Sequence, residues 1–77
     1  MKRDNSRHHA TFKILGNNIK NIRLSKNISQ EELAFRISSS RNYIGCIERA
    51  EKYPSLAILI DISKALNITL TDMFNQI

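Results

Sequence analysis

Residues 29–49 read SQEELAFRISSSRNYIGCIER, a stretch that predicts two short helices joined by a tight turn. Ser29 and Glu32 have the spacing of a capping box, so we expect the first helix to begin at Gln30. The consecutive serines at 38–40 prefer turns and helix caps to helix interiors, and they mark the connection. The stretch therefore predicts a helix, a tight turn and a second helix.

The second helix of this stretch is expected to run from Arg41 to about Ala50, with Ser40 as its N-cap. Only a few of its positions are strongly apolar, so most of its surface is expected to face away from the core. A small residue is needed where the two helices approach each other, and Ala34 stands at that place. The apolar residues expected to pack both helices on the core are Leu33, Ile37, Ile44 and Ile47.

Upstream of this stretch, helical periodicity begins at Phe12, and the predicted helix ends near Asn27. Residues 1–11 carry three basic residues and almost nothing apolar, which predicts a flexible basic arm. The folded domain is therefore expected to span residues 12–77. The apolar stripe of its first helix consists of Leu15, Ile19 and Ile22.

Downstream, Pro54 prevents simple continuation of the preceding helix, and Ser55 is predicted to cap a fourth helix that ends at Asn67. Thr69 and Asp72 have a further capping arrangement, which predicts a short fifth helix. No segment alternates with a period of two, so we expect an all-α fold without a sheet. The apolar residues of these two helices are Leu56, Leu59, Ile62, Leu66, Leu70, Met73 and Phe74.

The composition limits the classes of protein to which the chain can belong. Its 77 residues suffice for one domain, and 12 basic against 7 acidic residues give a formal charge of +5. This charge favours a polyanionic partner such as nucleic acid or an anionic membrane surface. The basic residues are spread rather than gathered opposite one apolar stripe, which disfavours the membrane surface. No apolar run approaches the roughly 20 residues that cross a bilayer, so we expect a soluble, cytoplasmic protein.

The sequence lacks the residue constellations of catalytic and metal sites. The only thiol, Cys46, is expected to face outward, without a histidine near it in the folded part of the chain. His8 and His9 fall in the predicted arm, where a solvated tail explains them better than a metal site, which needs three or four converging ligands. We therefore expect no enzyme activity, no metal, no cofactor and no small-molecule ligand.

Three segments carry a family resemblance, namely SQEELA, RNYIGCIER and YPSLAILIDISKALNITLTDMF. In combination they resemble the phage-repressor-like (Cro/C1, XRE-type) helix-turn-helix family over roughly residues 15–74. The resemblance implies a five-helix, lambda-repressor-like domain whose helix-turn-helix consists of the second and third helices. Within that family, residues 41–44 and 47–49 look like those of restriction–modification controller proteins.

Two serines of the turn depart from the family pattern. Ser38 stands where glycine is common, so a left-handed backbone there would carry modest strain. Ser39 stands where an apolar residue usually plugs the turn. These departures are expected to shift the second helix of the motif slightly and to leave the fold intact.

The resemblance implies that Arg41 and Asn42 begin the recognition helix and reach base edges. The chemistry agrees, since arginine can bind guanine and asparagine can bind adenine through two hydrogen bonds each. Tyr43 and Cys46 are predicted to contact bases as well. Tyr43 could contact a thymine methyl group, or it could contact a phosphate in place of a base. A solvated helix face is the alternative for all four residues. The residues predicted to contact DNA phosphates are Gln30, Ser40, Arg49 and Lys52.

Arg23 and Glu48 have a different predicted role. The family pattern pairs an arginine and a glutamate at these positions, which implies a structural ion pair that joins the first helix to the third. Removal of one partner from a buried pair would strand the other charge at a cost of several kcal/mol.

We predict a sequence-specific transcriptional regulator that binds double-stranded DNA as a homodimer on a palindromic operator, since one helix-turn-helix reads only a few base pairs. The competing function is an antitoxin-type protein-interaction module that also binds its own operator. We disfavour it because little chain is left beyond Ile77 to wrap around a partner. The predicted dimer interface, whose residues could instead complete a small core, consists of Ile58, Ile60, Leu70, Phe74 and Ile77.

Overall fold

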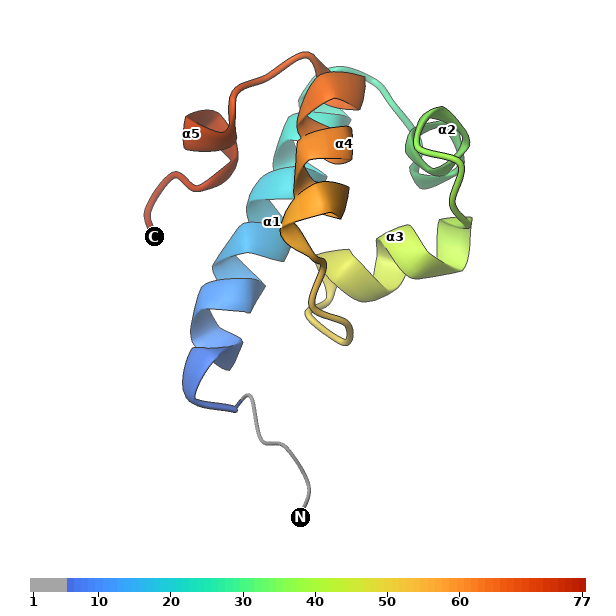
Figure 1. The fold of residues 1–77 in the computed structure, drawn as a ribbon. Coiled ribbons are helices and arrows are strands. Elements are labelled where there is room, and N and C mark those ends of the chain that lie inside the picture. The colour runs from blue at the N-terminus through green and yellow to red at the C-terminus, as the bar shows by residue number, and fades with distance from the viewer. Residues whose placement is uncertain (1–5) are drawn as a thin grey trace.

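A computed structural model describes residues 6–77, which form helices and loops with no β-strand among them (Figure 1). The predicted all-α fold with five α-helices is confirmed, and one 3₁₀ turn precedes them. The elements are η1 (Ser6–His8), α1 (His9–Ser25), α2 (Gln30–Arg36), α3 (Arg41–Glu48), α4 (Leu56–Leu66) and α5 (Leu70–Met73).

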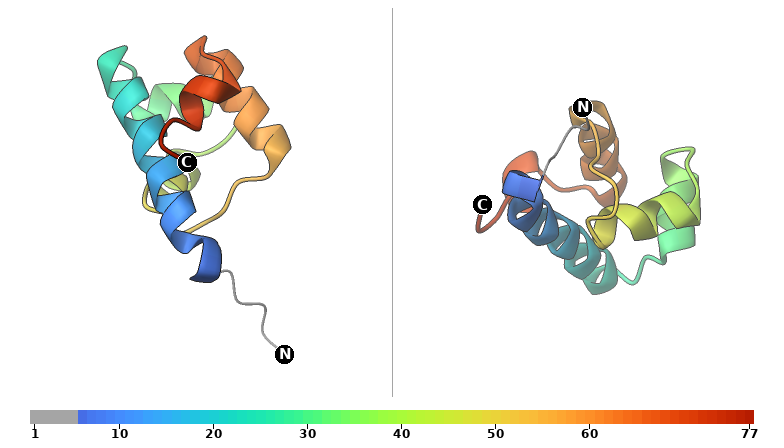
Figure 2. Two further views of the ribbon diagram at one scale, coloured as in Figure 1. Left: turned by 90° about the vertical axis from the view of Figure 1, so that its left-hand side faces the viewer. Right: turned by 90° about the horizontal axis from the view of Figure 1, so that it is seen from below.

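The helices enclose one small core. α3 packs against both α1 and α2, while α2 also contacts α4. α5 packs on α4 and α1, as the left-hand view of Figure 2 shows. α2 and α3 lie on the side of the molecule away from α5 and the C-terminus (Figure 1). The side chains with almost no exposed surface are Ile19, Leu33, Ile44, Ile47, Ile62, Leu66 and Met73.

Polar N-caps begin four of the helices, as predicted. Each cap hydroxyl accepts a hydrogen bond from the backbone N–H three residues later, at distances of 2.9–3.2 Å. The capping box is complete only at Thr69, whose backbone N–H donates to the Asp72 carboxylate at 3.1 Å. The capping box predicted at Ser29 is wrong in one of its two hydrogen bonds. The Glu32 carboxylate accepts from Arg36 at 2.9 Å and not from the Ser29 backbone N–H. The four caps are Ser29, Ser40, Ser55 and Thr69.

Residues with positive φ angles follow each of the first four α-helices. Ser38 has a φ of 55°, which is the left-handed conformation expected for the turn between α2 and α3. Ala50 has a φ of 59° after α3, which ends at Glu48 rather than at the predicted Ala50. The other two such residues are Asn27 and Asn67.

The folded part of the chain begins earlier than the predicted boundary at Phe12. The predicted arm at 1–11 falls partly on residues 1–5, which lie outside the described residues, but η1 and the start of α1 occupy the remainder. Tyr53 explains the difference, since its hydroxyl lies 2.8 Å from His9 Nδ1 in a hydrogen bond. Its ring also stacks on Phe12 with the centroids 4.1 Å apart. This loop residue therefore anchors the first turns of α1.

The helices of the described residues include none that is both long and apolar enough to cross a membrane. Within the same residues, no three His, Cys, Asp or Glu side chains gather in a way that could hold a metal ion.

Candidate nucleic-acid interface

The turn between α2 and α3 fixes the direction of α3. The Ser39 N–H donates to the carbonyl of Ala34 at 2.8 Å, which closes the end of α2. Ala34 itself is buried, as expected for a small residue between two approaching helices. Ile44 and Ile47 are fully buried beneath α3, and the residues of this helix that stay exposed are Arg41 and Asn42 in its first turn.

Arg23 and Glu48 form a buried ion pair between α1 and α3. Arg23 Nε and Nη2 donate to the two Glu48 carboxylate oxygens at 2.7 and 3.0 Å. Only 6% of the Arg23 side chain and 2% of the Glu48 side chain are exposed. Arg23 Nη1 also donates to the carbonyl of Ile28 at 2.8 Å. The guanidinium group thus ties α1 to α3 and to the loop before α2.

Gln30, predicted to contact a phosphate, belongs to the same network in this structure. Its side-chain amide donates to Glu48 Oε1 at 3.0 Å from the first position of α2. The Glu48 carboxylate therefore accepts hydrogen bonds from both α1 and α2. This arrangement holds α3 against the other two helices, and the Gln30 amide takes part in that support.

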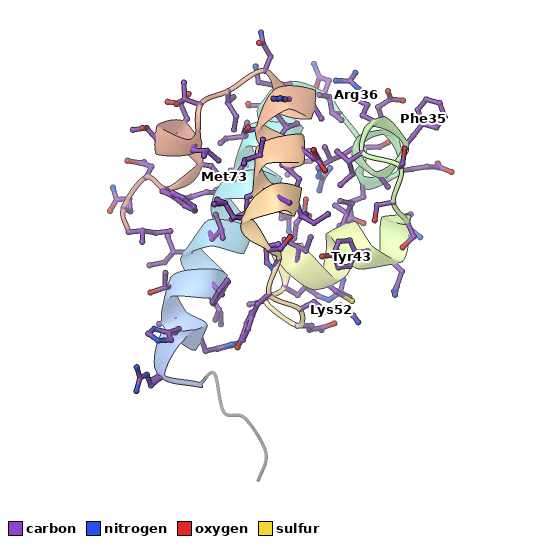
Figure 3. All side chains as sticks on the ribbon, in the orientation of Figure 1. Phe35, Arg36, Tyr43, Lys52 and Met73 are labelled. Atoms are coloured by element: carbon purple, nitrogen blue, oxygen red, sulfur yellow. The ribbon has the colours of Figure 1, made fainter. Side chains whose placement is uncertain are left out.

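The first turn of α3 presents two of the predicted base-reading residues to solvent. Arg41 and Asn42 are both exposed. Tyr43 follows as a half-buried side chain that packs partly against the core, and Figure 3 shows it on α3. An arginine and an asparagine exposed in the first turn of a recognition helix can reach base edges in a major groove.

Cys46 does not face outward, so that expectation was wrong. Its exposed fraction is only 8%. The reason is Arg49, whose guanidinium folds back over α3 until Nη2 lies 3.9 Å from the Cys46 Sγ. Gly45 leaves room for this fold, because a Cβ there would lie 2.9 Å from Arg49 Nη1. As the side chains stand here, Cys46 cannot contact a base.

The three residues around α3 that are predicted to contact phosphates are all exposed, but they differ in their hydrogen bonds. Ser40 is exposed, and its hydroxyl accepts the Tyr43 N–H at 3.1 Å, which leaves the hydroxyl proton for another acceptor. Lys52 is exposed in the segment that follows α3 (Figure 3). Arg49 is exposed as well, but its guanidinium is bound by the Glu51 carboxylate at 3.0 and 3.1 Å.

Two structural residues escaped the sequence analysis. Gly16 in α1 lies directly under α3, and the signal for it was a glycine inside a helical pattern. Asn18 donates to the carbonyls of Met73 and Asn75 at 2.9 and 2.8 Å, which fastens the C-terminal segment to α1. No local pattern marks that contact, because it joins residues more than 50 positions apart.

Of the five residues predicted for a dimer interface, Phe74 and Ile77 are exposed and the other three are half-buried. Ile58 and Leu70 pack half-buried on the core, and Ile60 is half-buried too. Leu56, one of the apolar residues of the predicted fourth helix, is 61% exposed at the first position of α4. It lines an apolar hollow of about 500 Å³. The other residues of this hollow are Thr11, Phe12, Leu15, Pro54, Leu59, Phe74 and Ile77.

These features define the class of protein. Two short helices meet at a tight turn, and a buried network holds the second helix while its first turn offers arginine and asparagine to solvent. This arrangement is a helix-turn-helix. The helix-turn-helix (HTH_3) family model matches residues 19–73, and the chain belongs to this family. It is a DNA-binding transcriptional regulator of the Cro/C1, XRE type and not an enzyme.

Comparison with characterised proteins confirms the predicted resemblance. The chain is 43% identical over 63 residues to the control protein C.BamHI of Bacillus amyloliquefaciens, covering 80% of this chain and 78% of that protein. It is 38% identical over 63 residues to the control protein C.SmaI of Serratia marcescens, covering 82% and 75%. Its fold is similar to the crystal structure of the restriction-modification controller protein C.AhdI from Aeromonas hydrophila. That similarity has a TM-score of 0.84 and 33% identity, and it covers 87% of this chain and 97% of the other.

Proposed function

We propose that this chain is a sequence-specific transcriptional regulator that binds a palindromic operator as a homodimer and controls a restriction–modification operon. The observation that carries the proposal is the exposed pair Arg41 and Asn42 at the start of α3, on a helix held from behind by a buried ion pair. The relatives named control proteins support the choice of operon.

The exposure of the polar side chains around α3 supports a division of labour among them. Arg41 and Asn42 read bases, while Ser40, Lys52 and the exposed Arg49 bind the phosphates beside them. Gln30 has a second amide proton with which to bind a phosphate while it holds Glu48. The formal charge of +5 adds attraction that does not depend on sequence.

A second copy of the chain supplies the other half of the reading surface. The apolar hollow with exposed Leu56, Phe74 and Ile77 at its edge is the surface that supports this part of the proposal. It lies away from the α2–α3 face, so pairing there leaves both recognition helices free. A two-fold dimer explains how so small a domain gains enough base contacts for specificity.

The test is a selection of bound sites from random duplex DNA with the wild-type chain and with Arg41→Ala. We expect the wild-type chain to enrich a two-fold symmetric site. Arg41→Ala should lose the preference at one base pair in each half-site and keep its nonspecific binding. Lys20→Ala is the matched control, since Lys20 is an exposed cation on α1 with no predicted base contact.

Four results would count against parts of the proposal. Uniform loss of affinity in Arg41→Ala would make Arg41 a phosphate contact. Enrichment of single half-sites would contradict the dimer. No enrichment by the wild-type chain would favour the antitoxin-type interaction module. A selected site that does not occur upstream of a neighbouring endonuclease gene would contradict the restriction–modification assignment.

A further inference from the structure

Arg49 and Glu51 form a two-pronged ion pair on the face where DNA phosphates are expected. Arg49 Nε donates to Glu51 Oε2 at 3.0 Å, and Nη2 donates to Oε1 at 3.1 Å. About half of each side chain is exposed, 55% for Arg49 and 56% for Glu51. The pair therefore lies open to solvent, where a third charged group can reach it.

The backbone after α3 brings these two residues together. The left-handed φ of 59° at Ala50 reverses the chain, and the Glu51 N–H returns to the carbonyl of Cys46 at 2.8 Å. This turn sets the Glu51 carboxylate beside the end of α3. Gly45 and Cys46 provide the surface over which the Arg49 guanidinium lies. The turn, Gly45 and Cys46 thus favour this position of the Arg49 guanidinium.

The chemistry of the two groups gives the pair a consequence for DNA binding. A guanidinium binds carboxylates and phosphates with the same fork of N–H groups. Glu51 already occupies Nε and Nη2, so a phosphate must displace the carboxylate to be bound by that edge. The hydrogen bonds between the two side chains raise the pKa of Arg49 and lower the pKa of Glu51, so the pair favours the charged form of each group.

We propose that Glu51 is an internal competitor of the DNA backbone for Arg49, and that it limits how tightly the chain binds DNA of any sequence. The inference rests on the proposed function, in which Arg49 binds a phosphate. Exchange of carboxylate for phosphate leaves the Glu51 anion beside the DNA backbone. Removing that anion should therefore tighten binding even where no base is read.

The test measures binding to a fluorescently labelled duplex of about 20 base pairs and mixed sequence, at several salt concentrations between about 50 and 200 mM. The proteins are the wild-type chain, Glu51→Gln, Arg49→Gln and the double variant. We expect Glu51→Gln to tighten binding by up to about fivefold at low salt, the scale of one exposed ion pair. The salt dependence should steepen by up to about one unit, since the Glu51 anion no longer offsets the charge with which Arg49 neutralises its phosphate.

Asp61→Asn is the matched control, because it removes one exposed carboxylate that forms no ion pair with the described residues. We expect a smaller gain for Asp61→Asn than for Glu51→Gln. In the Arg49→Gln background, Glu51→Gln should add no more than Asp61→Asn does. The melting temperature of Glu51→Gln, followed by circular dichroism, should change little, as expected for a pair on the surface.

Several outcomes would overturn the inference. Equal gains in affinity for Glu51→Gln and Asp61→Asn would mean that Glu51 affects DNA binding only through the net charge of the protein. Weaker binding by Glu51→Gln would mean that Glu51 positions Arg49 for the phosphate instead of competing with it. Unchanged binding by Arg49→Gln would remove Arg49 from the interface while the proposed function stands. Failure of the wild-type chain to bind any duplex would refute the proposed function itself.

Discussion

Gly16 of α1 lies so close to Ile47 of α3 that a Cβ at position 16 would lie 2.5 Å from the Ile47 carbonyl oxygen. The same Cβ would lie 2.7 Å from the carbonyl oxygen of Glu48. Both atoms belong to the backbone of the recognition helix and cannot move without moving that helix. The contact explains why a helix interior carries a glycine despite its cost in helix stability.

We predict that Gly16→Ala lowers the free energy of unfolding by about 1–3 kcal/mol, the usual cost of overpacking a rigid site. Gly45→Ala is the matched control, since its Cβ would meet only the flexible Arg49 guanidinium at 2.9 Å. In that variant the better helix propensity of alanine, about 1 kcal/mol, should offset the displacement of Arg49. Urea unfolding followed by circular dichroism compares the two, and equal stabilities would contradict the close approach at Gly16.

The buried Arg23–Glu48 pair leads to a second prediction. Arg23→Met should lower the free energy of unfolding by about 3–5 kcal/mol, because the Glu48 carboxylate is left buried without its main partner. The double variant Arg23→Met/Glu48→Met should recover most of this loss. Glu32→Gln, which breaks the exposed pair with Arg36, should cost less than about 1 kcal/mol. A double variant no more stable than Arg23→Met would show that the methionines pack poorly and would refute the prediction.

The features that could be predicted from the sequence are those that depend on residues close together in the chain. Ser29, Ser40, Ser55 and Thr69 cap the predicted helices because a cap depends only on residues within one turn. The apolar periodicity likewise placed Ile44 and Ile47 in the core. The pairing of Arg23 with Glu48 came from the family pattern and not from periodicity.

Contacts between distant or flexible groups were beyond these signals. Cys46 is buried because Arg49 folds across it, and that fold depends on the chain reversal at Ala50. The early start of α1 depends on Tyr53, which lies 44 positions from its hydrogen-bond partner His9. In both cases the apolar periodicity predicts which face of a helix packs on the core. It does not predict which distant side chain covers the remaining faces.

Because Ser38 has a left-handed backbone conformation, we predict that glycine at this position stabilises the fold. Ser38→Gly should raise the free energy of unfolding by about 0.5–1 kcal/mol, because relief of the strained φ outweighs the added entropy of the unfolded chain. The melting temperature should rise by a few degrees, roughly 4 °C. Ala50→Gly should gain less, since Ala50 is buried and loses the contacts of its methyl group. A melting temperature lowered by Ser38→Gly would contradict the presence of strain.

The apolar hollow between α1, α4 and the C-terminus predicts which residues matter for dimerisation. Leu56→Glu should weaken the proposed dimer by at least about 30-fold, since a central interface residue contributes 2 kcal/mol or more. Leu24→Glu is the matched control, because Leu24 is 52% exposed on α1 but does not line the hollow. Sedimentation equilibrium measures the dimer dissociation constant of both variants. A dimer lost in Leu24→Glu and kept in Leu56→Glu would place the interface elsewhere.

The ion pair after α3 gives the last prediction, on the titration of Glu51. Hydrogen bonding to Arg49 holds the pKa of Glu51 below its ordinary value, so Arg49→Gln should raise this pKa towards that value. The small stability that the pair provides is present above the unfolded-state pKa and is lost as the pH falls through the lowered pKa. Side-chain NMR of the Glu51 carboxyl carbon measures the shift, with Arg36→Gln as a control that breaks a different exposed pair. An unchanged Glu51 pKa in Arg49→Gln would show that the pair does not persist in solution, and the competition with DNA phosphate would then have no basis.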